Sequence, residues 1–237
     1  LFHCTTRSFI RLHNWRGCTL ILFDGCSWTW GDELENNEKD RFSTLVSDHL
    51  GKDHVNISER GKSNDGILRS TMEYCENNKV DFAVIQFTKI SRREILDSTG
   101  DFYNSLCIGK VRNACKKKYS PHRASLYYFK YLNTNTDDVA NYYKNKYLLE
   151  NFFKGKSIPY YFVCLNKKND LLIRKPSSWQ KMSDTEPVTS LYTLFGGDKK
   201  DGTPYFDYPP SGHPNIKGHQ KIADHILQNL HIRETML

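Results

Sequence analysis

The sequence predicts a single-domain α/β fold, a three-layer α/β/α sandwich with a mainly parallel sheet in the middle layer. Short apolar runs alternate with amphipathic segments along the chain, and each run is continuously hydrophobic rather than alternating. Continuous runs are typical of parallel strands buried on both faces. Strands that alternate with helices favour a sheet covered by helices on both sides. The 237-residue chain is long enough to bury one core of this kind.

The first expected elements are a strand, a helix and a second strand. Residues 19–23 (TLILF) form an apolar run that stops at Asp24, as a buried central strand would. Residues 32–50 have the periodicity of a helix, and Gly51 follows in the position of a C-terminal cap. Residues 55–57 are then expected to form a short second strand.

The remaining elements continue the alternation. A second helix is predicted over residues 65–77, and a third strand over residues 82–87 (FAVIQF). Residues 159–165 (PYYFVCL) predict a fourth strand, after which residues 166–212 are rich in loops. A final helix with an apolar stripe is predicted over residues 215–230.

The domain organisation follows from these elements. Residues 19–237 are expected to form one domain, with a helical insertion at about residues 97–155 whose periodicity is strongest over residues 137–153. Residues 1–18 carry three arginines and no acidic residue, and they form an N-terminal extension of uncertain status.

The composition excludes several functional classes. No apolar run approaches the roughly 20 residues that a membrane span needs. The formal net charge is +7, but lysines come in short runs typical of solvated faces, and without a recognition-helix pattern or zinc spacing we expect no nucleic-acid partner. The seven cysteines form no CxxC pair, which indicates no metal site and favours reduced thiols in a compartment such as the cytoplasm.

A candidate nucleophile follows the first strand in the segment from Phe23 to Gly31 (FDGCSWTWG). A serine just past a central strand, with a glycine close before it, can expose its hydroxyl at the edge of the sheet. Its own backbone N–H then points to where an oxyanion would form. We therefore expect Ser27 to be the nucleophile, and a serine hydroxyl needs a base to remove its proton.

A candidate base lies before the final helix, in the segment from Ser211 to His219 (SGHPNIKGH). His213 stands in a loop that prolines stiffen on both sides, which suits an imidazole held in place better than a core histidine. The sequence therefore predicts that His213 activates Ser27.

These segments together resemble the SGNH (GDSL-like) hydrolases. Gly25-Cys26-Ser27 is similar to the family's Gly-Asp-Ser block, and His213 before the last helix is similar to its final block. Asn56 and Gly61 resemble the asparagine and glycine of the second block. The resemblance implies a flavodoxin-like SGNH fold, an acyl-enzyme mechanism without a cofactor, an oxyanion contact from the Gly61 N–H, and an acetylated carbohydrate, lipid or other small ester as substrate.

The sequence departs from the family pattern at two places. The third block should place an asparagine after residues 82–87, but the chain continues as Phe87-Thr88-Lys89, so Asn64 is considered as a replacement donor to the oxyanion or as a helix cap. The family's acid lies three residues before the histidine, where this chain has Pro210. Either Asp207 orients His213, or the site is a Ser–His dyad with a backbone carbonyl in that role.

Two other functions remain open at this point. An inactive SGNH-fold module that binds a ligand would explain both departures. Residues 56–63 (NISERGKS) match a P-loop except at the first glycine, so a nucleotide-binding protein is a further alternative. After the third strand, Arg92, Arg93 and Glu94 could form either a surface salt-bridge cluster or an anion-binding rim. The oligomeric state is not predicted.

Overall fold

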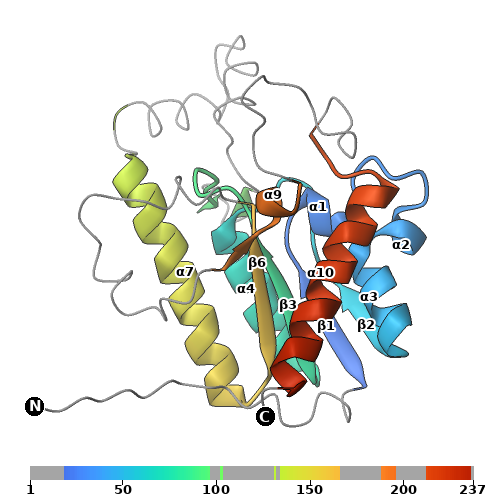
Figure 1. Ribbon diagram of the computed structural model, residues 1–237. Helices are drawn as coiled ribbons and strands as arrows, with labels where there is room; N and C mark the ends of the chain where they lie inside the picture. The colour runs from blue at the N-terminus through green and yellow to red at the C-terminus, as the bar shows by residue number, and fades with distance from the viewer. Residues whose placement is uncertain are drawn as a thin grey trace, which may run out of the picture.

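A five-stranded parallel sheet forms the centre of the computed structural model, which describes residues 19–96, 102–103, 131, 134–165, 188–195 and 212–235 (Figure 1). The strand order is β2-β1-β3-β6-β7, and each neighbouring pair is parallel. The strands are β1 (Leu20–Asp24), β2 (Asp53–Asn56), β3 (Phe82–Phe87), β6 (Tyr160–Cys164) and β7 (Thr189–Ser190). The α/β fold class predicted from the sequence is therefore confirmed.

The order of the strands determines where a site can form. The chain moves outward from β1 to β2 and then returns to β3 on the other side of β1. Phe23 pairs with Asn56 on one side and with Val84 on the other, so these three strands end at one edge of the sheet. Ligands of such sheets bind beyond the carboxyl ends of the strands, where the order reverses.

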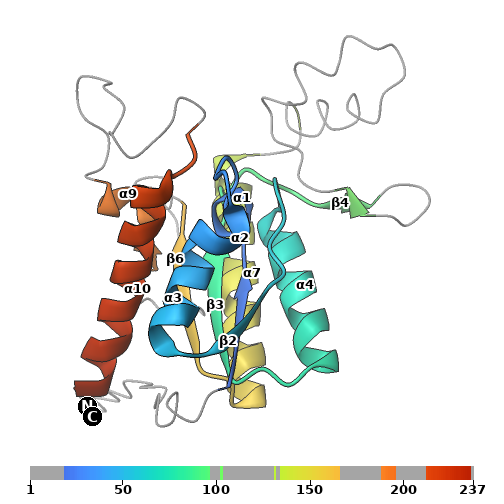
Figure 2. The same cartoon turned by 90° about the vertical axis from the view of Figure 1, so that its right-hand side faces the viewer.

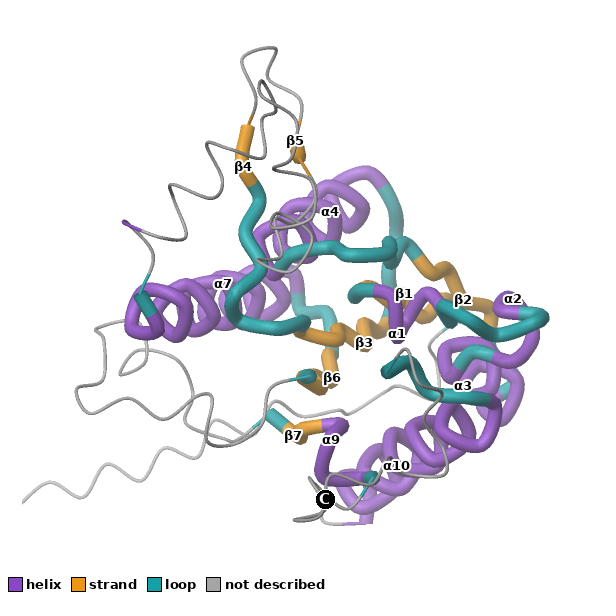
Figure 3. The backbone as a smooth tube through the Cα atoms, turned by 90° about the horizontal axis from the view of Figure 1, so that it is seen from above, coloured by secondary structure: helices purple, strands orange, loops and turns teal. Residues whose placement is uncertain are grey.

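Helices cover both faces of the sheet (Figures 2 and 3). α3 (Phe42–Leu50) and α10 (Ile216–Thr235) contact each other on one face, and α4 (Asn64–Asn77) and α7 (Asn135–Lys156) contact each other on the opposite face. Each pair encloses a buried apolar cluster. One contains Ile21, Val84, Val46 and Ile226, and the other contains Leu22, Ile85, Ile67 and Leu149.

The shorter elements lie at the ends of these layers. They are α1 (Ser27–Trp30), α2 (Asn37–Asp40), α9 (Leu191–Leu194) and the antiparallel pair β4 (Ile95–Leu96) and β5 (Phe102–Tyr103). Among the described helices, none is long and apolar enough to cross a membrane.

The structure changes two details of the sequence prediction. The helix expected over residues 32–50 is interrupted: α2 ends at Asp40, Arg41 is extended, and α3 begins at Phe42. The two-residue strand β7 lies in a stretch predicted to be loops, because two residues carry no periodic pattern. Within the expected insertion at about residues 97–155, the described residues include β5 and α7, and α7 buries Leu149 and Phe153 against the sheet.

His219 joins the start of α10 to the start of α3. Its Nδ1 accepts a hydrogen bond from the Phe42 N–H at 3.1 Å, and its ring stacks on the Phe42 ring at 5.9 Å between centroids. Burial of the ring, together with the nearby His213, lowers the pKa of His219 to about 4. The folded chain therefore holds this imidazole neutral at pH values where the unfolded chain would protonate it.

This burial predicts a loss of stability in mild acid. Because the unfolded chain binds the proton near the ordinary pKa of 6.5 and the folded chain only near 4, the free energy of unfolding should fall as pH falls from 6.5 toward 4. Between pH 7 and pH 5 we expect a loss of about 2 kcal/mol from this group alone. Urea unfolding at the two pH values should show a smaller loss in His219→Asn, and an equal loss in both proteins would contradict the assignment.

Candidate active site

Ser27 is the first residue of α1, directly beyond the carboxyl end of β1. Its side chain is buried, with 5% of the residue exposed. The turn before Ser27 is tightly packed, because a Cβ added at Gly25 would lie 2.3 Å from Thr29 Oγ1 and 3.0 Å from Gln86 Cβ. Only glycine fits where the chain turns this close to β3.

Asn56, at the end of β2, holds α1 in place. Its Nδ2 donates to the Thr29 carbonyl oxygen at 2.8 Å and to Ser43 Oγ at 3.0 Å. Its Oδ1 accepts from the Ser58 N–H at 3.1 Å. One amide therefore ties the helix that carries Ser27 to α3 and to the loop that follows β2.

The structure brings His213 to Ser27 although 186 positions separate them in sequence. His213 Nε2 lies 2.9 Å from Ser27 Oγ, a hydrogen-bond distance. Gly212 before it has a φ of 87°, a conformation that favours glycine. Asn215 after it caps α10, because its Oδ1 accepts from the Gly218 N–H at 3.0 Å. A glycine turn and a capped helix therefore set the position of the imidazole.

Two consecutive carboxylates that sequence reasoning missed approach the same imidazole. Asp32 Oδ2 lies 3.7 Å from His213 Nε2, and Glu33 Oε1 lies 3.2 Å from His213 Nδ1. Asp32 also forms an ion pair with Arg60 at 2.7 Å. A signal was present in the sequence, since both residues follow the Ser27 block within six positions. Asp207, the acid considered from sequence, lies outside the described residues.

Of the two expected oxyanion donors, Gly61 stays a candidate, whereas the side-chain amide of Asn64 is already engaged. Gly61 has a φ of 79° and precedes Lys62 in the loop after β2. Asn64 is buried, and its amide pairs with the backbone of Thr88: Oδ1 accepts from the N–H at 2.8 Å and Nδ2 donates to the carbonyl at 3.3 Å. Asn64 is not the helix cap either, because Ser63 Oγ caps α4. We therefore do not place Asn64 among the oxyanion donors.

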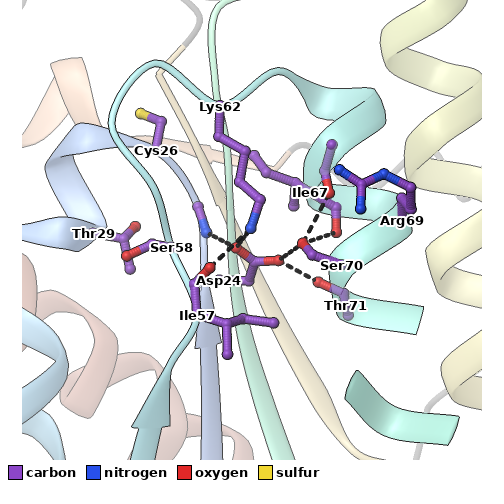
Figure 4. A network of polar contacts seen from close by, with 12 residues as sticks. Asp24, Cys26, Thr29, Ile57, Ser58, Lys62, Ile67, Arg69, Ser70 and Thr71 are labelled. Carbon is purple, nitrogen blue, oxygen red and sulfur yellow. Dashed lines mark hydrogen bonds and ion pairs between the residues drawn. The ribbon is translucent and has the colours of Figure 1, made fainter. Parts of the chain in front are cut away.

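Beneath this loop, Lys62 forms a buried ion pair with Asp24 at the end of β1 (Figure 4). Lys62 Nζ donates to Asp24 Oδ1 and to the Ile57 carbonyl, each at 2.8 Å. Asp24 Oδ2 accepts from the hydroxyls of Ser70 and Thr71 at 2.6 and 2.9 Å. Complete burial raises the pKa of the Asp24 carboxyl, and the Lys62 ammonium and these hydroxyls oppose that rise.

This pair overturns the P-loop alternative. A P-loop lysine must present its ammonium to a phosphate, whereas the Lys62 side chain is 1% exposed and points into the protein toward Asp24. Within NISERGKS, Ser58, Lys62 and Ser63 are buried beside the sheet edge, whereas Glu59 and Arg60 are exposed.

The residue before Ser27 is a buried cysteine that feels the charge of Arg92. Cys26 Sγ lies 3.9 Å from Ser27 Oγ. Burial raises the pKa of the Cys26 thiol, but the positive charge of Arg92 and hydrogen bonds that include one with Thr88 outweigh it, so the pKa is lowered. Arg92 Nη1 donates to Thr88 Oγ1 at 2.7 Å. Arg93 is instead paired with Asp138 at 3.0 Å, so the arginines of this cluster differ in their surroundings.

No group of three or more His, Cys, Asp or Glu side chains that could hold a metal ion occurs in the part of the chain that the structure describes.

The buried pair predicts a large stability effect. Lys62→Met should lower the free energy of unfolding by about 3–5 kcal/mol, because it leaves the Asp24 carboxylate buried without its partner. As a matched control, Lys79→Met removes an exposed ammonium that lies 3.7 Å from Asp81, and it should cost less than about 1 kcal/mol. Chemical denaturation of both variants measures the difference, and equal losses would show that the buried pair is not a structural requirement.

Comparison with known proteins gives structural matches only. No protein-family model matches the sequence, and no curated protein matches it significantly. TesA is 12% identical with a TM-score of 0.53 over 91% of this chain and 99% of that chain. The psychrotrophic esterase EstA from a Pseudoalteromonas species is 12% identical with a TM-score of 0.50 over 90% and 96%.

A member of the lipolytic protein G-D-S-L family from Veillonella parvula is also similar, at 12% identity and a TM-score of 0.46 over 89% of this chain and 97% of that chain. At these identities the likeness to TesA and EstA is a likeness of fold. This chain therefore shares with TesA and EstA an α/β architecture, a parallel sheet flanked by helices. Its candidate site lies beyond the carboxyl ends of β1, β2 and β3.

Proposed function

We propose that this protein is a serine hydrolase of the SGNH (GDSL-like) type that cleaves an ester through an acyl-enzyme. The observation that carries the proposal is the 2.9 Å separation of Ser27 Oγ and His213 Nε2. A serine and a histidine in hydrogen-bond contact are the minimum arrangement for nucleophilic acyl transfer. The fold shared with the esterase EstA supports the same conclusion.

The first step is attack on the ester carbonyl. His213 Nε2 takes the proton from Ser27 Oγ while the oxygen forms a bond to the carbonyl carbon, whose π electrons move to the carbonyl oxygen. Collapse of this intermediate expels the alcohol, which receives the proton from the imidazolium. A water molecule then repeats the sequence on the acyl-enzyme and regenerates Ser27, so no cofactor is required.

The negative charge of the intermediate needs donors beyond the edge of the sheet. The N–H of Ser27, in the first turn of α1, has no acceptor within its own helix. We assign it and the Gly61 N–H as oxyanion donors, in keeping with the SGNH resemblance. Arg92, whose charge lowers the pKa of the neighbouring Cys26 thiol, is the group we consider in place of the missing asparagine of the third block.

The substrate class proposed is a small ester, such as an acetylated carbohydrate or a lipid. The binding-module alternative is distinguished by turnover, since a module without catalysis would bind such a ligand without hydrolysing it. The first test therefore uses a small, reactive ester that needs few binding contacts.

Hydrolysis of p-nitrophenyl acetate provides that test. Ser27→Ala and His213→Ala should each lower kcat by at least about a thousandfold, because either change removes the activated nucleophile. The free energy of unfolding of Ser27→Ala should change by less than about 1 kcal/mol, as for substitutions that open no core cavity.

Matched controls come from α3. Ser47 is a buried serine whose hydroxyl donates to the Ser43 carbonyl, and His49 is exposed at the end of that helix. Ser47→Ala and His49→Ala should retain the parent turnover. Parent protein without turnover above that of Ser27→Ala would instead favour the binding-module alternative.

A further inference from the structure

The two ring nitrogens of His213 face different carboxylates. Nε2, which contacts Ser27, has Asp32 Oδ2 at 3.7 Å, and Nδ1 has Glu33 Oε1 at 3.2 Å. Nδ1 is a buried atom, and no described residue forms a hydrogen bond with it. The Nδ1–Oε1 pair is close enough for an ion pair but is not aligned as a hydrogen bond, and such contacts often tighten only when substrate is bound.

The backbone at Glu33 is strained toward this position. Its φ is 70°, in the left-handed region that is unfavourable for a residue with a Cβ. The strain follows the end of α1, where Gly31 also has a positive φ of 83° and the Asp32 N–H donates back to the Ser27 carbonyl at 2.9 Å. The segment after α1 thus turns back toward Ser27, and this turn places the Glu33 carboxylate beside the His213 imidazole.

Asp32 has a different task. Its carboxylate is engaged by the Arg60 guanidinium at 2.7 Å, which links the turn after α1 to the loop after β2. It also lies on the side of the ring that must receive the proton from Ser27. A carboxylate can fix the productive form of the imidazole only from the Nδ1 side, because Nε2 has to stay free of a proton before attack.

We propose that Glu33 is the positioning residue that holds the His213 tautomer with its proton on Nδ1, an inference that rests on the function proposed above. The Nδ1–H donates to Glu33 Oε1, so the Nε2 lone pair faces Ser27 Oγ. When Nε2 takes the proton from Ser27, the charge of the imidazolium forms beside the Glu33 carboxylate, and the Nδ1 proton stays where it is.

This assignment takes the acid from the segment that follows the nucleophile. A proline three residues before His213, where the resemblance would place an acid, then costs nothing in catalysis. It also makes Asp207 a competing candidate that one experiment can separate from Glu33.

The experiment compares four single variants in p-nitrophenyl acetate hydrolysis: Glu33→Gln, Asp207→Asn, Asp32→Asn and Glu35→Gln. Glu33→Gln should lower kcat at least about a hundredfold with KM changed less than about threefold, since loss of the carboxylate partner in a triad costs up to about 10⁴. Asp207→Asn should cost less than about tenfold. Asp32→Asn should cost less than Glu33→Gln. Glu35→Gln changes a nearby glutamate that is exposed like Glu33, and it should retain the parent kcat.

A second readout does not depend on turnover. Nitrogen-15 NMR distinguishes a protonated from an unprotonated ring nitrogen, and the His213 signals are identified by their absence in His213→Ala. At neutral pH the parent should show the proton on Nδ1, and Glu33→Gln should shift the population toward a proton on Nε2.

A Glu33→Gln variant with kcat within tenfold of the parent and an unchanged tautomer would overturn the proposal. If Asp207→Asn then lowers kcat strongly, Asp207 is the positioning residue. If neither change lowers kcat, the site is a Ser–His dyad. If the parent shows no turnover that depends on Ser27, the proposed function fails, while the tautomer comparison still decides the role of Glu33.

Discussion

The buried pair of Lys62 and Asp24 is the interaction on which the site depends most. It joins the end of β1 to the loop after β2 and, through Ser70 and Thr71, to α4. Ser27 follows Asp24 by three residues, and Gly61 directly precedes Lys62, so the pair sets the spacing between the proposed nucleophile and a proposed oxyanion donor. Burying two charges is costly, and the cost is offset here because the two hydroxyls, the Ile57 carbonyl and the ion pair satisfy both groups.

The position of the base depends on the packing of α10. His219 fixes the first turns of α10 against α3 through the Phe42 N–H and the stacked Phe42 ring. His213 lies six residues earlier, beyond the Asn215 cap, so the same packing that buries His219 carries the imidazole to Ser27. Acid that protonates His219 should therefore disturb the site as well as the fold.

Much of the fold could be predicted because its central strands have strong patterns. The apolar runs that became β1, β3 and β6, and the stripe that became α10, are local signals. Ser27 and His213 could be proposed as a pair because each follows or precedes such an element, and parallel topology brings strand ends together. The resemblance to SGNH hydrolases added Gly61.

The parts that sequence reasoning missed depend on contacts between distant residues. By its sequence context Lys62 could be a phosphate ligand, but its ammonium donates to the carboxylate of Asp24, which lies 38 residues earlier. By its sequence context Asn64 could offer its amide to a substrate, but that amide forms hydrogen bonds with the backbone of Thr88. Glu33 belongs to an acidic stretch that resembles solvated surface, and only a left-handed backbone and the fold of α10 bring it to His213. These contacts depend on the folded backbone, so the sequence could indicate at most that Glu33 follows Ser27 closely in the chain.

If His213 activates Ser27 for nucleophilic attack, Ser27 should react with a fluorophosphonate probe, which reports an activated serine whatever the substrate. The folded protein is incubated with the probe and digested, and the modified peptide is mapped by mass spectrometry. We expect one covalent adduct, on Ser27, that forms far more slowly when His213 is replaced by alanine. An unmodified Ser27, or an adduct that forms at the same rate without His213, would contradict this expectation.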